Sequence, residues 1–331
     1  MMKLGSCLLL LILAANSHGQ LKTEEPDVRK EIKVRVASLW QAEQFDELDA
    51  MATTYRTSRG RTPSGVWQLS VFYSALREQV ESDGRDSRVW AAQLERARRW
   101  TTRTPTSPSA HIQYAEALTR QAWHQRGDGF ARSVTAEALV QFRTTLALAR
   151  KHLEDNRKAA QVDPGYYASL LLMAVWQGWP KAQVQGLLEE ALSREKEFWP
   201  TYMAVVEYHS PYWHGSAAEL ERFASFAAER LGEPDGDMLY ARIYWYAADR
   251  YFDGQFFGSK ISCERMMRGI DRLVALNPDG WNVNYAAGFA VSCGDKGRAK
   301  ALFDRIGERP LLEAFGGSSK NFAHFRAWAN Q

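Results

Sequence analysis

Two of the three cysteines in this 331-residue sequence, Cys263 and Cys293, lie in its C-terminal third. Cys7 lies in the segment predicted below to be a signal peptide, so the exported chain would keep two cysteines, and an even number favours a disulfide. No Cys-x-x-Cys spacing points to redox chemistry. If helices run over about 261–276 and 280–293, folding one back on the other brings the start of the first beside the end of the second. The spacing therefore predicts a structural disulfide between Cys263 and Cys293.

Two histidines, His209 and His214, flank the sequence Ser-Pro-Tyr-Trp, with Glu207 and Glu219 close by. Imidazole and carboxylate groups at this spacing could bind a metal ion or transfer a proton. The same residues also have a structural explanation, because the proline would end one helix and the Tyr-Trp pair would fill the turn. We favour the structural explanation and predict no metal ion and no catalytic residue at this turn.

The densest group of aromatic residues lies within 240–257. Aromatic side chains at helical spacing usually pack in a core, although Tyr and Trp can also offer a rigid surface with a polar tip to a ligand. We expect most of this group to pack between helices. The candidates for binding come from this group and from the Tyr-Trp turn, and they are Tyr208, Trp213, His214, Tyr240, Tyr244 and Trp245.

Composition and motifs exclude several common classes of function. The chain is 45% hydrophobic and 24% charged, which is enough for a substantial core, and its net charge of +3 is close to neutral. Its basic residues are interspersed with acidic and aromatic ones, so we expect no nucleic-acid partner. The sequence contains no zinc-protease, serine-hydrolase, phosphate-loop or calcium-loop motif. We therefore predict no cofactor and expect a protein that is not an enzyme.

Apolar residues recur at the period of an α-helix through most of the chain, which predicts an all-α fold. The stretch 184–192 places its apolar side chains on one helix face and its charged side chains on the other. Ser216 stands three residues before Glu219, a spacing typical of a capped helix start. No run of alternating β-branched residues between tight turns predicts a sheet.

Prolines divide the C-terminal half at Pro164, Pro200, Pro234, Pro278 and Pro310. Subtracting successive positions gives steps of 36, 34, 44 and 32 residues, which are the lengths of helical hairpins. Proline is tolerated in the first turn of a helix, and each step also contains an internal break, so each is predicted to hold two helices. We expect a helical region over 20–160 that continues into repeats over 161–331.

The last of these intervals resembles a tetratricopeptide repeat. Small residues at 286–290 match the first helix of the repeat, Gly294-Asp295 matches the turn, and Ala299 and Phe303 match the second helix. The resemblance implies antiparallel helical hairpins stacked into a tetratricopeptide-like α-solenoid with an extended concave surface.

Two passages carry a more specific resemblance. They read Ser-Arg-Gly-Arg-Thr-Pro-Ser-Gly-Val-Trp-Gln-Leu at 58–69 and Ser-Pro-Tyr-Trp-His-Gly-Ser at 210–216. Together they resemble an uncharacterised bacterial family of helical-repeat, tetratricopeptide-like domains of unknown function, in which a glycine is usual where His214 stands here. The resemblance covers most of the chain and implies no known activity.

Residues 1–19 are predicted to be a signal peptide, because Lys3 precedes an apolar run at 7–15 that is too short to span a bilayer. Cys7 lies at the beginning of this run, where it is badly placed for lipid attachment. No later stretch reaches the roughly 18 apolar residues of a membrane span. We therefore expect a soluble exported protein, either periplasmic or extracellular.

Our leading hypothesis is a binding or scaffolding protein of the bacterial envelope that holds a protein or peptide partner on its helical surface. The alternative is an all-α carbohydrate-active enzyme of the glycosidase or lyase type, since such enzymes also combine helical hairpins with aromatic clefts. An enzyme of that kind needs two carboxylates, or a Tyr/His pair, that face one another across a cleft. An open arc of helices would favour binding, whereas a closed ring is the arrangement of the enzymes.

Overall fold

The computed structural model describes residues 21–80, 87–127, 133–211, 213, 215–252, 256 and 258–331. Within these ranges the secondary structure is helical and contains no β-strand, which confirms the predicted all-α class. An isolated antiparallel bridge joins Arg61 and Trp67 in the loop before the third helix. The signal peptide predicted for 1–19 lies outside the described residues.

The helices fall into two successive sets along the chain. The first set comprises α1 (Glu25–Gln41), α2 (Phe45–Ser58), α3 (Gln68–Val80), α4 (Ser87–Arg103), α5 (Pro108–Arg126), α6 (Ala136–Asp155) and α7 (Arg157–Ala160). The second set comprises α8 (Pro164–Trp176), α9 (Lys181–Arg194), α10 (Pro200–His209), α11 (Ala217–Leu231), α12 (Gly236–Tyr251), α13 (Cys263–Leu276), α14 (Gly280–Ser292), α15 (Lys296–Ile306), η2 (Leu312–Phe315) and α16 (Ser319–Ala329).

Local sequence signals account for many of the helix ends. Pro164 and Pro200 begin α8 and α10, where the missing N–H of proline would have no partner in the helix. The Ser216 side chain accepts a hydrogen bond of 3.2 Å from the backbone N–H of Glu219 and so caps α11. Each of the four proline-bounded intervals holds two helices, as their lengths predict.

The hydrophobic core forms two clusters that meet on α8. Tyr167 packs in the cluster built from the earlier helices, whereas Leu171, one turn further along, packs in the cluster that extends to α16. Trp176 at the end of α8 contacts both clusters. Because one helix contributes residues to both clusters, the packing is continuous across the predicted boundary at residue 160.

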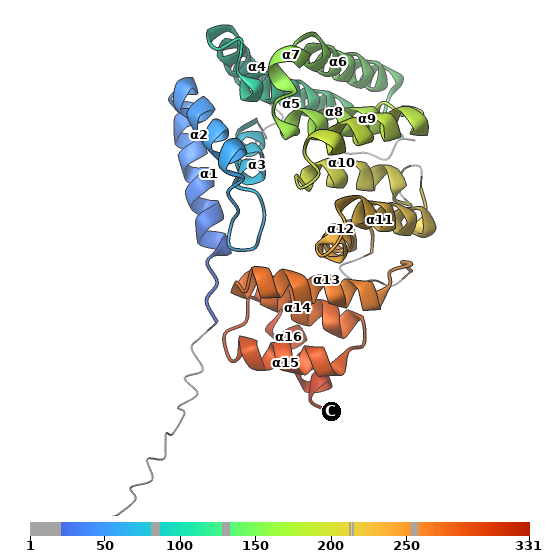
Figure 1. Cartoon of the computed structure of the whole chain (residues 1–331). Coiled ribbons are helices and arrows are strands. Elements are labelled where there is room, and N and C mark those ends of the chain that lie inside the picture. Colours follow the sequence, from blue (N-terminus) through green and yellow to red (C-terminus); the bar gives the residue numbers. More distant parts are fainter. Residues whose placement is uncertain are drawn as a thin grey trace, which may run out of the picture.

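The helices surround a central space, and the beginning of the first helix reaches the C-terminal third of the chain (Figure 1). The backbone N–H of Glu24 donates to Asp279 Oδ2 at 2.7 Å, and the N–H of Gly280 donates to the carbonyl of Lys22 at 2.7 Å. These bonds join residues about 255 positions apart at the start of α14. The arrangement is therefore closed by direct contact, so an open arc does not describe it.

The two cysteines lie at bonding distance, with Sγ atoms 2.11 Å and Cα atoms 5.5 Å apart. Cys263 is the first residue of α13, and Cys293 follows the last residue of α14. The disulfide predicted from the helical hairpin is confirmed. Among the described helices, none is both long enough and apolar enough to cross a membrane.

Candidate functional site

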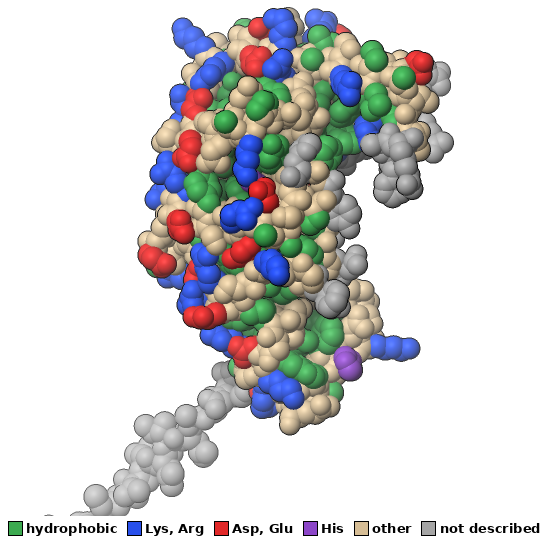
Figure 2. Space-filling model, turned by 90° about the vertical axis from the view of Figure 1, so that its right-hand side faces the viewer, with side chains coloured by type: hydrophobic (Ala, Val, Ile, Leu, Met, Phe, Trp, Pro, Cys, Tyr) green, Lys and Arg blue, Asp and Glu red, His purple; other side chains and the backbone are tan. Residues whose placement is uncertain are grey.

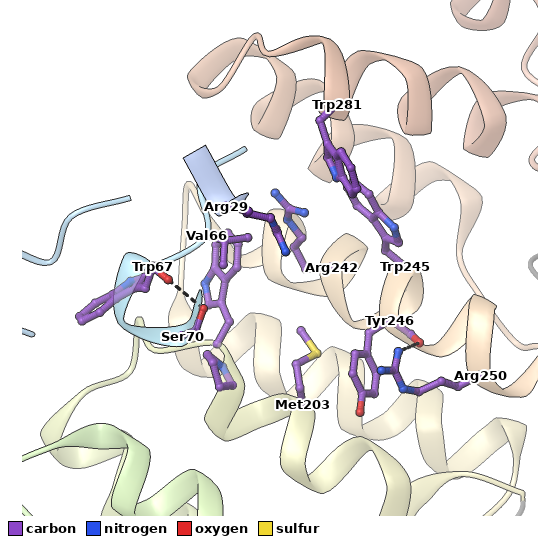
Figure 3. Close-up of a pocket in the computed structure, with 12 residues that line it drawn as sticks. Arg29, Val66, Trp67, Ser70, Met203, Arg242, Trp245, Tyr246, Arg250 and Trp281 are labelled. Atoms are coloured by element: carbon purple, nitrogen blue, oxygen red, sulfur yellow. Dashed lines mark hydrogen bonds between the residues drawn. The ribbon is translucent and has the colours of Figure 1, made fainter. Parts of the chain in front are cut away.

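A cavity of about 260 Å³ lies where α1, α10, α12, α14 and the loop before α3 converge (Figure 3). We call it the central pocket. Its lining combines aromatic rings with guanidinium groups, and the residues are Arg29, Val66, Trp67, Ser70, Trp199, Pro200, Met203, Arg242, Trp245, Tyr246, Arg250 and Trp281. These elements are far apart in the sequence, so the cavity depends on the closed arrangement of the helices.

The loop 59–67 forms one wall of the central pocket and is held by a buried carboxylate at the start of α1. Glu25 accepts hydrogen bonds from the backbone N–H of Ser64 at 2.7 Å and from the Thr62 hydroxyl at 2.9 Å, and it pairs with Arg29. Burial by itself would raise the pKa of Glu25, but the charge of Arg29 and these hydrogen bonds outweigh it, so the pKa is lowered. Glu25 therefore remains ionised and fixes the loop to α1.

The same loop is tied to the C-terminal helices through one carbonyl group. The Ser64 carbonyl accepts hydrogen bonds from Arg242 Nη2 of α12 and from Asn282 Nδ2 of α14, the latter at 3.2 Å. Gly65 follows with φ +86°, and a Cβ there would lie 2.7 Å from Asn277 Nδ2. The loop therefore requires glycine at this position, both for its backbone conformation and for the close approach of its neighbour.

Arg242 is the most unusual group of the central pocket, because its side chain is buried and only 8% of the residue is exposed. Its guanidinium carbon lies 4.6 Å from the ring centre of Trp245 and 5.3 Å from that of Trp199, so indole rings cover it. Burial, and then the nearby positive charge of Arg29, lower the pKa of Arg242 to about 9, against the opposing effect of Glu25.

The hydrogen bonds of Arg242 are incomplete. Nη2 donates to the Ser64 carbonyl and to Asn282 Oδ1, the latter at 3.3 Å. The buried Nε has no hydrogen-bond partner among the described residues, and no described carboxylate forms an ion pair with this guanidinium. The indole Nε1 of Trp67 is also buried without a partner, but the Trp67 ring points away from Arg242 and Met203 (Figure 3). Arg242 therefore keeps an unpaired buried N–H beside the cavity.

Further cations surround the same space. The guanidinium carbon of Arg29 lies 5.6 Å from the ring centre of Trp281, and that of Arg250 lies 3.8 Å from the ring centre of Tyr246. Figure 3 shows Arg29 and Arg242 directed toward the same region, with Met203 between the aromatic groups. No Asp, Glu, His or Cys is among the described lining residues. The pocket suits an anion with an apolar part.

A neighbouring cavity of about 420 Å³ shares Arg29, Met203 and Tyr246 with the central pocket and extends toward α5 and α8. It contains one carboxylate, Glu116, which accepts a hydrogen bond of 2.7 Å from the Ser169 hydroxyl. Arg77 Nε lies 3.5 Å from the other carboxylate oxygen. The only acidic group of this cavity is thus engaged by neighbouring side chains of the described chain.

Surface charge elsewhere is mixed. Figure 2 shows a face on which Lys and Arg side chains are interspersed with Asp and Glu, in keeping with the net charge of +3. The arginines of the central pocket therefore do not continue a basic patch on this face.

Of the residues selected from the sequence, Trp245 lines the central pocket. Tyr240 and Tyr244 are fully buried, and both hydroxyl groups donate to Glu221 Oε2, at 2.7 and 2.5 Å. The backbone N–H of Ser262 in turn donates to the Tyr240 hydroxyl at 2.7 Å. These two tyrosines connect α11, α12 and the segment before α13, and they do not line the pocket.

The candidates from the Tyr-Trp turn lie elsewhere. Tyr208 is buried and its hydroxyl donates to the Trp179 carbonyl at 3.4 Å, while Trp213 is 36% exposed with its ring centre 6.5 Å from that of Trp123. His214 lies outside the described residues. The structure therefore does not bring these candidates together with Trp245 at the central pocket.

His209 occupies a structural position. Its ring stacks on Phe223 with centres 4.7 Å apart, and Nδ1 lies 3.7 Å from Glu219 Oε2, beyond hydrogen-bond distance. Burial, and then the charge of Lys181, lower the pKa of His209 to about 4. No group of three or more potential metal ligands occurs among the described residues.

The binding residues predicted from the sequence do not include Arg29, Trp67, Met203, Arg242 and Trp281, which also line the pocket. One signal could have pointed to Arg242, since it is the single charged residue in the apolar stretch 238–248 of α12. An isolated charge within a buried helix needs a partner or a function. The others carry no local signal, because their neighbours in the pocket come from distant segments.

Comparison with known proteins finds no family model, no curated protein and no solved structure that matches this chain. The resemblance of 58–69 and 210–216 to a helical-repeat family therefore stays a prediction. The loop 59–67 within the first passage nevertheless has a defined position, since it joins α1, α12 and α14 at the central pocket. The chemistry of that pocket is the basis for the function.

Proposed function

We propose that this chain is an exported helical-repeat protein that binds the end of a protein or peptide partner in the central pocket and does not catalyse a reaction. The lining of the pocket carries the proposal. It offers aromatic walls, several cations and an unpaired buried N–H of Arg242, with no carboxylate or imidazole among its described members. Such a site is equipped for recognition and holds no carboxylate or imidazole for proton transfer.

The proposed architecture is a tetratricopeptide-like solenoid of stacked antiparallel hairpins whose concave side is the central space. In support, the central pocket and its neighbour are lined from α1, α3, α5, α8, α10, α12 and α14, whereas α2, α4, α6, α9 and α11 supply almost no lining. An alternation of inner and outer helices is typical of helical-repeat proteins. The inner helices would then carry recognition and the outer helices stability.

The size of the site favours a chain end over a folded partner. Cavities of about 260 and 420 Å³ are of the size that admits a small ligand or a few residues of a peptide. The partner would therefore enter through a terminal or extended segment. Export is supported by the predicted signal peptide and by the disulfide between Cys263 and Cys293, since disulfides persist in oxidising compartments.

The test is site-specific photo-crosslinking in the exported protein, with p-benzoylphenylalanine placed at Met203 inside the central pocket. The matched control carries the same group at Val140, an exposed position of α6 that is 62% accessible. We expect a discrete adduct from Met203 that Val140 does not give, with a peptide or protein identified by mass spectrometry. A folded Met203 variant that forms no adduct in envelope preparations would contradict the proposal.

A carbohydrate-active enzyme is the second candidate for two reasons, which are the carboxyl group of Glu207 and the closed arrangement of the helices. Burial raises the pKa of Glu207, against the hydrogen bond of 3.3 Å from Trp176 Nε1. A carboxyl group whose pKa is raised beside aromatic rings is suited to general acid catalysis of glycoside cleavage. Glu116, in the neighbouring cavity, would be the second carboxylate.

Turnover separates the two candidates. Wild-type protein, Glu207→Gln and Glu116→Gln are assayed with a panel of oligosaccharides for release of reducing ends and of unsaturated products. The binding proposal expects no turnover by any of the three. Turnover by the wild type that both substitutions abolish would replace binding with catalysis as the function.

A further inference from the structure

We infer that the central pocket recognises a carboxylate attached to an apolar group, and that the buried guanidinium of Arg242 pairs with it. The inference rests on the proposed binding function and names the chemical group that the site selects.

A buried guanidinium normally has an acidic partner, because removing a charge from water costs several kcal/mol that a counter-ion offsets. Arg242 has none among the described residues, and its nearest acidic group, Glu25, is already engaged by Arg29, Ser64 and Thr62. The neutral carbonyl of Ser64 offsets only part of the charge. The counter-ion of Arg242 is then the carboxylate of a ligand that enters the cavity.

The direction of approach is restricted by the indole rings. Trp245 and Trp199 both lie within 5.3 Å of the Arg242 guanidinium carbon, measured to their ring centres. A guanidinium stacked on aromatic rings still presents its N–H groups in its own plane. The guanidinium of Arg242 is not saturated, because its Nε is buried and has no partner among the described residues. The ring of Trp67 points away from Arg242 and Met203 and supplies no donor to this space (Figure 3).

The charge and shape of the lining fit a carboxylate better than a phosphate. A carboxylate has a single charge and two oxygen atoms in one plane, which match the planar N–H groups of one arginine. A phosphate carries more charge and a third acceptor oxygen, which would remain poorly solvated against the tryptophans and Met203. Arg250 also lines the cavity, whereas the charge of Arg29 is paired with Glu25.

The remainder of the lining defines what is attached to the carboxylate. Trp281, Met203 and Trp245 face the cavity with apolar surface (Figure 3). A carboxylate next to an apolar side chain occurs at the C-terminus of a peptide and in a free aromatic or aliphatic acid. Both share the recognised chemistry, and the experiment distinguishes the two sources.

The experiment is calorimetric titration of the mature protein with two matched pairs of probes. One pair is acetyl-Ala-Ala-Phe with a free carboxylate and the same peptide as its C-terminal amide. The other pair is indole-3-acetate and indole-3-acetamide. We expect each acid to bind about tenfold or more tightly than its amide, since a charge-assisted bond is lost in the amide. Tighter binding of the peptide acid indicates a chain end, and tighter binding of indole-3-acetate indicates a small acid.

Two variants test the role of Arg242. Arg242→Lys should reduce the preference for the acid several-fold, provided that circular dichroism shows a folded protein. The matched control is Arg103→Lys, which should leave the preference unchanged, because Arg103 is an exposed residue of α4 outside the central pocket.

The inference is overturned if acid and amide bind equally, or if neither pair binds at millimolar concentration. It is also overturned if folded Arg242→Lys keeps the same preference for the acid as Arg103→Lys. These results leave the proposed function to be decided separately, because the adduct at Met203 reports any occupant of the pocket, whatever its charge.

Discussion

At the scale of single residues, this protein keeps several ionisable groups away from water and satisfies most of them. Glu25 is held as a carboxylate by hydrogen bonds and by Arg29, and Asp163 is completely buried with its own partners. Arg242 is the exception, because its charge has no acidic partner among the described residues. This exception points to a functional residue, because a buried charge without a counter-ion lowers the free energy of unfolding.

The ion pair between Asp163 and Arg56 allows the stabilising effect of a buried ion pair to be measured in this protein. One carboxylate oxygen caps α8 by accepting from the Gly165 N–H at 2.8 Å, and the other accepts from Arg56 Nη1 at 3.0 Å. We expect Asp163→Ala to lower the free energy of unfolding by about 3–5 kcal/mol, because it removes the cap and leaves Arg56 unpaired. Urea denaturation measures the loss.

The matched control for that prediction is Arg103→Ala, which breaks an exposed ion pair with Asp46. Its loss should be at most about 1 kcal/mol, because water screens exposed pairs. Equal losses for the two substitutions would show that burial of Asp163 does not set the strength of its pair.

Acid should destabilise the fold through buried neutral histidines. Burial lowers the pKa of both His209 and His152 to about 4, with the charge of a second group adding to the effect in each case. The unfolded chain titrates near 6.5 and therefore takes up protons first, so stability is intact above pH 6.5 and falls as the pH drops toward 4. For His209 the total loss is at most about 3 kcal/mol.

Melting temperature between pH 7.5 and 4 measures this loss. His209→Gln should lower the melting temperature at pH 7.5 and flatten its dependence on pH, because the glutamine does not titrate. An unchanged slope in His209→Gln and in a matched His152→Gln variant would contradict the assignment to these two histidines.

At the scale of elements, the loop 59–67 links distant helices to one another although it forms no helix or strand itself. It connects α1, α12 and α14 through Glu25, Arg242 and Asn282, and it carries Trp67 into the central pocket. Its conformation depends on Gly65, which has a positive φ and lies against Asn277. Rigid placement of the loop is therefore a condition for a defined binding site.

Gly65→Ala should disrupt this loop more than an equivalent change elsewhere. We compare it with Gly178→Ala, at the end of α8, where φ is +67° and no atom lies within 4 Å of the added Cβ. Gly178→Ala should cost about 1 kcal/mol for the backbone alone. Gly65→Ala should cost more, by roughly 1–2 kcal/mol, because the new Cβ contacts the Asn277 side chain.

Thermal denaturation of both variants gives these losses, and crosslinking at Met203 reports whether the pocket survives. The adduct should weaken in Gly65→Ala and persist in Gly178→Ala. Equal melting temperatures and equal adducts would mean that Asn277 moves aside at no cost and that the loop does not need glycine.

At the scale of the whole molecule, closure joins the start of the chain to its C-terminal third. Asp279 has two roles in this contact, since Oδ1 caps α14 by accepting from the Trp281 N–H at 2.8 Å and Oδ2 accepts from the Glu24 N–H at 2.7 Å. Gly280 adds a bond to the Lys22 carbonyl. The central pocket exists because these segments meet.

Asp279→Ala should therefore open the molecule at this contact. We expect faster hydrogen exchange at the start of α1 and a loss of about 1–2 kcal/mol, since the cap and the contact are removed together. Asp295→Ala is the control, because Asp295 caps α15 with a bond of 3.0 Å from Arg298 and does not touch the N-terminal segment. Similar exchange at α1 in both variants would argue against closure through Asp279.

Much of the fold follows from interactions between residues close in the sequence. The all-α class, the two helices in each proline interval and the cap at Ser216 depend on helical period and on backbone groups within a few residues. The disulfide is nearly as local, because one short turn fixes how α13 and α14 bring Cys263 and Cys293 together.

The site depends on contacts that no local pattern contains. Tyr244 and Trp245 are adjacent on α12, and helical geometry turns one toward Glu221 in the core and the other toward the central pocket. Which of the two faces the pocket depends on where α1, α10 and α14 lie. The surroundings of Arg242 depend on the tertiary structure in the same way. Its indole neighbours meet it, and its Nε is buried without a partner, only once distant helices have packed around it.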